Sequence, residues 1–151
     1  MAIGIDPLWV WGEASEQPRI LHSMIRVRDL DASLRFYRDG LGMTVLDRYD
    51  FEQGRFSILF LSYAGYRDGP AALELTYNWD RAEDYSHGSG YGHVAIGVPD
   101  VPAMYERLAS FGGKQTTAPK SMLAGAPQLA FVKDPDGYAI ELIQLRRNPS
   151  G

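Results

Sequence analysis

The 151-residue chain contains no cysteine. Disulfide bonds, thiolate nucleophiles and metal sites with cysteine ligands are therefore excluded, and any bound metal must be held by nitrogen and oxygen atoms. Basic residues are also sparse: 15 lysines and arginines stand against 19 aspartates and glutamates, for a net charge of −4. Nucleic-acid binding requires a basic face that neutralises phosphates, so we do not expect nucleic acid as a partner.

Long apolar runs are missing as well. A membrane-spanning helix needs about 20 consecutive apolar residues, and no run approaches this length, so no membrane partner is expected. The N-terminal extension, residues 1–19, lacks a basic segment and contains Glu13 and Glu16, which is atypical of a secretory signal. We therefore predict a cytoplasmic protein. Trp9 and Trp11 in this extension fit either a segment packed on the body or a second subunit, or a flexible tail.

The chain contains an internal duplication. The pattern His-x-x-Ile-x-Val-x-Asp occurs at residues 22–29 and again at 93–100. An Ala-Leu-Glu-Leu segment at 72–75 is matched by Ala-Ile-Glu-Leu at 139–142. Each copy therefore supplies one histidine near its start and one glutamate near its end.

Apolar periodicity and turn residues predict the order strand, helix, strand, strand, strand in both copies. The first copy spans residues 20–79, a polar linker covers 80–90, and the second copy spans 91–146. The elements are predicted at 20–27, 29–41 (helix), 43–49, 56–63 and 71–77, and then at 92–98, 100–111 (helix), 114–117, 128–133 and 138–145. Turns are predicted at 68–70 and 134–137, and Leu30, Leu34, Tyr37 and Leu41 are predicted to form the inward face of the first helix. We expect an α+β fold in which two βαβββ modules form curved mixed sheets around a cleft.

Polar residues fall on one face of the predicted strands. Alternation places His22 and Arg26 on a common face, and likewise Glu74 and Asn78. A glutamate in the middle of an apolar strand is costly unless it is paired or coordinated. The alternative is a sheet with one solvated face, which is common in antiparallel sheets. Two equivalent glutamates favour a site for a divalent metal, with His22, Glu74, His93 and Glu141 as ligands.

Three other motifs are not expected to form functional sites. His87 lies in the polar linker and is expected to be a solvated loop residue. The glycines at 88–92 precede a strand, whereas a dinucleotide-binding loop follows one. Residues 134–137, Asp-Pro-Asp-Gly, lack the other ligands of a calcium loop and are predicted to form a hairpin turn.

The duplicated pattern resembles the vicinal oxygen chelate superfamily, and it is specifically similar to glyoxalase I (lactoylglutathione lyase). The resemblance covers residues from about 20 to 145 and rests on five segments. These are 21–27, 34–37, 73–79 (Leu-Glu-Leu-Thr-Tyr-Asn-Trp), 90–96 and 130–142, which includes Asp-Pro-Asp-Gly-Tyr. It implies a homodimeric lyase with active sites at the interface, which isomerises the hemithioacetal of methylglyoxal and glutathione to S-lactoylglutathione.

The resemblance also implies residue roles. The family's metal ligands correspond to His22, Glu74, His93 and Glu141, and Glu141 takes the role of catalytic base, with Glu74 able to share the proton transfer. Arg26 and Asn78 correspond to the family's glutathione contacts. The compact length resembles the nickel- or cobalt-activated class, with zinc or manganese as alternatives.

Two further glutathione contacts of the family do not match: Ser89 stands where some members have arginine, and Lys120 is offset from the family's lysine. The alternatives that share the fold are an epimerase, an extradiol dioxygenase, and a non-catalytic small-molecule-binding protein. An acidic residue at position 74 favours glyoxalase I over the first two, and four intact ligands argue against the third.

Overall fold

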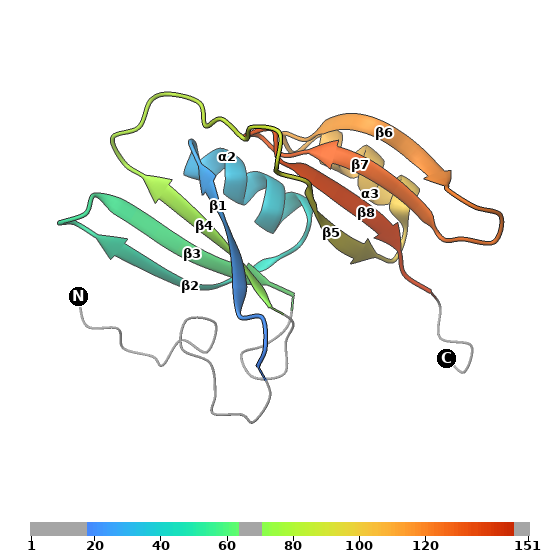
Figure 1. The fold of residues 1–151 in the computed structure, drawn as a ribbon, viewed down its shortest axis with the longest axis horizontal. Coiled ribbons are helices and arrows are strands. Elements are labelled where there is room, and N and C mark those ends of the chain that lie inside the picture. Colours follow the sequence, from blue (N-terminus) through green and yellow to red (C-terminus); the bar gives the residue numbers. More distant parts are fainter. Residues whose placement is uncertain (1–17, 64–70, 147–151) are drawn as a thin grey trace. The chain divides into compact units, whose positions relative to one another are not determined.

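The computed structural model describes residues 18–63 and 71–146, and it confirms the duplicated βαβββ order (Figure 1). The first copy consists of β1 (His22–Val27), α2 (Leu30–Leu34), η1 (Arg35–Gly40), β2 (Thr44–Phe51), β3 (Phe56–Ser62) and β4 (Ala72–Asn78). The second consists of β5 (His93–Val98), α3 (Val101–Ala109), β6 (Lys114–Ser121), β7 (Gln128–Lys133) and β8 (Ala139–Gln144). Residues 1–17 of the N-terminal extension and the turn predicted at 68–70 lie outside the described residues.

Each copy forms a four-stranded mixed sheet, and the two sheets have the same topology. The strand orders are β1-β4-β3-β2 and β5-β8-β7-β6. The first and last strand of each copy pair in parallel, β1 with β4 and β5 with β8, and the other neighbours are antiparallel. This parallel pair brings the histidine of the first strand beside the strand that carries the glutamate.

Strand alternation separates a core face from a polar face in each sheet. The core face of the first sheet includes Ile25, Val27, Leu73 and Leu75, all buried. The corresponding residues of the second sheet, Ile96, Val98, Ile140 and Leu142, are buried too. The histidines and glutamates lie at alternate positions, so they occupy the opposite face of each sheet.

The second helix, predicted over 100–111, is observed as α3 from Val101 to Ala109, with Asp100 as its N-terminal cap. The side chain of Asp100 accepts a hydrogen bond from the backbone N–H of Ala103 at 3.0 Å, which satisfies one of the free donors in the first turn of α3. The chain leaves the helix through Gly112, whose φ of +86° is readily adopted by glycine.

The first helical segment differs from the regular α-helix predicted over 29–41. After Leu34 it widens into the π-helix η1, in which the N–H of Leu41 donates to the carbonyl of Phe36 at 2.9 Å. The wider turn buries the adjacent residues Phe36 and Tyr37 completely. The 3.6-residue periodicity predicted an inward Tyr37 and missed Phe36.

The described residues divide by their contacts into two compact units, and the division does not follow the duplication completely. The first unit contains the residues up to 31 and 42–85; the second contains 32–41 and 86 onward. The helical residues 32–41 therefore pack within the second unit. Arg107 of α3 donates to the carbonyl oxygens of Gly40 at 2.9 Å and Asp39 at 2.8 Å, and Gly40 lies against Leu108.

The strand predicted at 114–117 is longer than expected, because β6 continues to Ser121 and includes Pro119. A proline lacks the N–H that an interior strand needs for its ladder of hydrogen bonds. As an edge strand, β6 tolerates the missing donor.

Among the described residues, no helix has the length and apolar character required to cross a bilayer.

Candidate functional site

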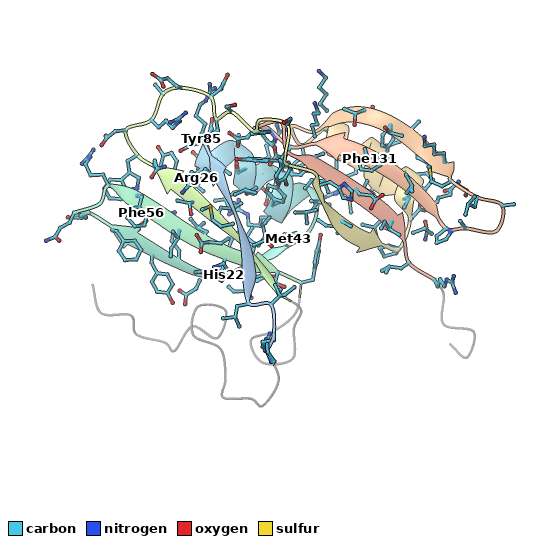
Figure 2. All side chains as sticks on the ribbon, viewed as in Figure 1. His22, Arg26, Met43, Phe56, Tyr85 and Phe131 are labelled. Atoms are coloured by element: carbon cyan, nitrogen blue, oxygen red, sulfur yellow. The ribbon has the colours of Figure 1, made fainter. Side chains whose placement is uncertain are left out.

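The first half of the predicted site lies on β1 and β4. His22 pairs in register with Ala72, two residues before Glu74 on the adjacent strand. The Nε2 atom of His22 lies 3.4 Å from Oε1 of Glu74, and the side chains are 29% and 13% exposed. Figure 2 shows His22 near the start of β1 and Arg26 further along the same strand.

The second half repeats this geometry on β5 and β8. His93 pairs with Ala139, again two residues before the glutamate. Nε2 of His93 lies 3.4 Å from Oε1 of Glu141, with the side chains 43% and 15% exposed. The equality of the two distances shows that the duplicated sequence produces duplicated geometry.

The donor set and its spacing fit one edge of a metal coordination sphere. Two ligand atoms that each lie ~2.1 Å from one ion are about 3.0–3.4 Å apart at octahedral to tetrahedral angles. The measured 3.4 Å separations are compatible with this range. Imidazole nitrogen and carboxylate oxygen together suit borderline divalent ions.

An aromatic ring supports each histidine, and the sequence analysis did not identify these rings. Phe60 on β3 is the register partner of Glu74, and its ring meets that of His22 edge to face at a centroid distance of 5.3 Å. Phe131 on β7 pairs with Glu141 and meets His93 in the same way at 5.4 Å. The hairpin register required to find them is not readable from the strand patterns alone. These contacts restrict how the imidazoles rotate.

The two glutamates differ in their hydrogen bonding. The hydroxyl of Thr76 donates to Oε2 of Glu74 at 2.8 Å. Ile143 occupies the equivalent position in β8, two residues after Glu141. Thr76 was not identified as a site residue from the sequence, because threonine is common in strands.

The predicted glutathione contacts, Arg26 and Asn78, both lie in the first unit. Arg26 is exposed and is the register partner of Thr76 on β4. Asn78 ends β4, and its Nδ2 donates to the hydroxyl of Tyr85 at 2.9 Å. Strand alternation places Arg26 on the face that carries His22, and Asn78 on the face that carries Glu74.

The remaining candidates are placed elsewhere. Lys120 is exposed on β6, and Ser89 is exposed in the link before β5. His87 is half-buried rather than solvated: its ring stacks on Tyr138 at a centroid distance of 4.0 Å. Its Nε2 is buried and has no hydrogen-bond partner among the described residues. The prediction of a solvated His87 was wrong because an aromatic partner lies beside it.

The structure thus brings the four predicted ligands together in two pairs, one in each unit. Within residues 18–63 and 71–146, no group of three or more histidines, aspartates or glutamates is arranged to hold an ion. Each unit holds two of the four predicted ligands.

Comparison with known proteins gives the family context of this geometry. The model of the "Glyoxalase/Bleomycin resistance protein/Dioxygenase superfamily" matches residues 19–142. A probable lactoylglutathione lyase of Vibrio cholerae is 45% identical over 133 residues, which cover 88% of this chain and 95% of the relative. The lactoylglutathione lyase of Haemophilus influenzae is 44% identical over 135 residues, covering 88% and 97%.

A solved structure supports the same relationship. The crystal structure of glyoxalase I from Zea mays aligns with a TM-score of 0.79 and 38% sequence identity. The alignment covers 87% of this chain and 46% of the maize chain, so this chain spans about half the length of the maize protein.

Proposed function

The chain belongs to the glyoxalase/bleomycin resistance protein/dioxygenase superfamily, and we propose from this premise that it is a lactoylglutathione lyase, glyoxalase I. Its substrate is the hemithioacetal that forms from methylglyoxal and glutathione, and its product is S-lactoylglutathione. The observation that carries this proposal is the pair of matching half-sites, each with a histidine nitrogen 3.4 Å from a glutamate oxygen.

His22, Glu74, His93 and Glu141 are the proposed ligands of one divalent ion. Nickel or cobalt is favoured, and zinc or manganese are the alternatives. The two carboxylates would offset the 2+ charge, which limits the cost of placing the ion in a partly dry site. A bound ion of this kind acts as a Lewis acid toward the oxygens of a substrate.

Glu141 is the proposed base. Its carboxylate takes the proton from C1, the carbon that carries the sulfur, and returns a proton to C2, so the reaction is an isomerisation without a net change of atoms. The chemically similar Glu74 is the second candidate for this transfer. Both side chains are mostly buried, which keeps competing water away from the transferred proton.

Arg26 and Asn78 would hold the thiol cosubstrate. The guanidinium of Arg26 would pair with a carboxylate of glutathione, and the amide of Asn78 would bond to its peptide groups. Both belong to the first unit, so the peptide portion would lie over β1 and β4.

A homodimer is the proposed assembly, with each active site completed by units from two chains. Two of the four ligands lie in each unit, so a site needs both kinds of unit. A cyclic dimer repeats the same contact twice and would form two equivalent sites. The cytoplasmic location stays a prediction from the sequence.

The function is tested by metal reconstitution. Protein stripped with a chelator is loaded in turn with nickel, cobalt, manganese and zinc, and is then assayed with methylglyoxal and glutathione. We expect S-lactoylglutathione to form with at least one of these ions and not with the stripped protein. If no ion supports glutathione-dependent product formation, the proposed function is wrong, and an epimerase or dioxygenase assay becomes the next step.

A further inference from the structure

The two half-sites are equivalent in their ligands and unequal in what surrounds the carboxylates. His22, Glu74 and Phe60 correspond position by position to His93, Glu141 and Phe131. The correspondence ends two residues after each glutamate, where β4 has Thr76 and β8 has Ile143. A duplicated site therefore carries a hydroxyl in one half and an apolar group in the other.

The Thr76 hydroxyl is well placed to hold its neighbour. It lies 2.8 Å from Oε2 of Glu74, while Oε1 of the same carboxylate faces His22 at 3.4 Å. Thr76 is only 9% exposed, and a β-branched side chain has few χ1 rotamers available. The donor is therefore fixed, and both oxygens of Glu74 are engaged.

Glu141 has no such restraint. One of its oxygens faces His93 at 3.4 Å, and the structure records no hydrogen bond to its carboxylate from the described residues. The side chain of Ile143, two residues further along the strand, has no hydrogen-bond donor. The carboxylate of Glu141 can turn about its side-chain torsions without breaking a protein hydrogen bond.

We propose that Thr76 is a positioning residue that gives the two glutamates different roles. Its hydroxyl keeps Glu74 in place as a fixed metal ligand. The absence of a hydroxyl at position 143 leaves Glu141 free to move between the ion and the substrate carbon atoms. This inference rests on the proposed function and adds to it the residue that makes one half of a nearly symmetric site different from the other.

Metal retention is the first test, because it does not depend on turnover. The variant Thr76→Val removes the hydroxyl and keeps the shape of the side chain, Thr76→Ser restores a hydroxyl, and Ile143→Thr introduces one beside Glu141. Loss of a hydrogen bond to a ligand weakens metal binding about 10–100-fold. In chelator competition with nickel, we expect Thr76→Val to bind at least about tenfold more weakly and Thr76→Ser to recover most of this loss.

Catalysis supplies the second test. In the Glu141→Gln background only Glu74 can move the proton, and Thr76 restrains it. We expect the double variant Glu141→Gln/Thr76→Val to be severalfold more active, at saturating metal, than Glu141→Gln alone. A residue with a merely structural role would make the double variant less active. Conversely, Ile143→Thr should lower kcat at nearly unchanged KM, while binding metal at least as tightly as the original protein.

Thr116→Val is the matched control, because the Thr116 hydroxyl donates to the backbone carbonyl of Phe131 at 3.1 Å, and the described residues show no hydrogen bond from it to a carboxylate. It should leave metal affinity unchanged. If Thr76→Val binds nickel as tightly as the original protein, or if the double variant is no more active than Glu141→Gln, the role of Thr76 is wrong. Should Thr76→Val not fold, Thr76→Ser and Ile143→Thr decide: unchanged kcat and metal affinity in Ile143→Thr overturn the proposal. If the unsubstituted protein is inactive with every ion, the proposed function is wrong. The metal affinities of the variants then still test the role of Thr76.

Discussion

Glu74 and Glu141 occupy equivalent strand positions, each 3.4 Å from its histidine and each opposite a phenylalanine on the neighbouring strand. A carboxylate in such an apolar setting is costly without a partner. A divalent ion would supply that partner for both, so the two residues have a common reason for their burial. What each then contributes to the reaction has to be separated by substitution.

Replacement of each glutamate by glutamine should separate ligand from base. Glu74→Gln should lower metal affinity at least about tenfold and reduce activity strongly. Glu141→Gln should retain substantial metal and lose kcat about 100-fold or more, since general acid–base catalysis contributes 10²–10⁴-fold. Metal content by elemental analysis and steady-state kinetics provide the measurements. Normal turnover by metal-loaded Glu141→Gln would show that another group moves the proton.

Arg26 should act on binding of the thiol rather than on chemistry. Removal of a charge-assisted hydrogen bond to a glutathione carboxylate in Arg26→Ala should raise KM about tenfold, with kcat changed less than about twofold. Arg28→Ala is the control, because Arg28 is exposed and forms its ion pair with Asp84. An equal rise of KM in both variants would indicate a general effect of charge and remove Arg26 from the site.

At the scale of elements, the turn at 134–137 does more than connect β7 with β8. Oδ1 of Asp134 accepts hydrogen bonds from the N–H groups of Asp136 at 2.9 Å and Tyr138 at 2.8 Å. Its Oδ2 accepts a hydrogen bond at 2.5 Å from the hydroxyl of Tyr37, which lies on η1. Burial raises the pKa of Asp134 to about 6, and burial and the adjacent Asp134 hold the pKa of Tyr37 well above its usual value. One aspartate thus fixes a hairpin and anchors a distant helical segment.

This raised pKa has a measurable consequence for stability. The folded protein binds the Asp134 proton more tightly than the unfolded chain does, because in the unfolded chain this carboxyl has its ordinary pKa of 3.8. The stability that the protonated carboxyl of Asp134 contributes is therefore present below about pH 4, and it is lost as the pH rises through about 6. Asp134→Asn should remove this pH dependence. Between pH 4 and pH 7 the free energy of unfolding of the original protein should therefore fall by about 2 kcal/mol relative to that of the variant.

Chemical denaturation at several pH values measures this difference. Asp80→Asn is a control of opposite sign, because the hydrogen bond from Arg55 lowers the pKa of Asp80. The contribution of Asp80 is present above its unfolded pKa and is lost as the pH falls. Parallel stability curves for Asp134→Asn and the original protein would contradict the effect of Asp134.

The elements show which parts of the structure could be predicted. The strands of both copies follow from apolar alternation, and the Asp100 cap follows from its position before Val101. The widening at Arg35–Gly40 could not be predicted, because it depends on the packing of Phe36 and Tyr37 in the second unit. The roles of Phe60 and Thr76 depend on strand register and rotamer, which a periodic pattern does not define.

At the scale of the whole molecule, the duplication sets what one chain can provide. Each unit carries one of the two His–Glu pairs, and residues 32–41 of the first copy pack in the second unit. How the two halves of a site are brought together can be tested with two inactive variants.

A mixing experiment distinguishes sites between chains from sites within one chain. Glu74→Gln alters only the first unit, and Glu141→Gln alters only the second. If His22 and Glu74 of one chain join His93 and Glu141 of the other, a mixed dimer of the two variants has one site with both substitutions and one intact site. Unfolding and refolding the two variants together should therefore restore about a quarter of the original activity, because half of the dimers are mixed and each has one good site. If every site forms within a chain, each site keeps one substitution and the mixture stays as inactive as its components. Size measurement of the refolded mixture is the control that dimers formed, and an active monomer at assay concentrations would contradict the assembly.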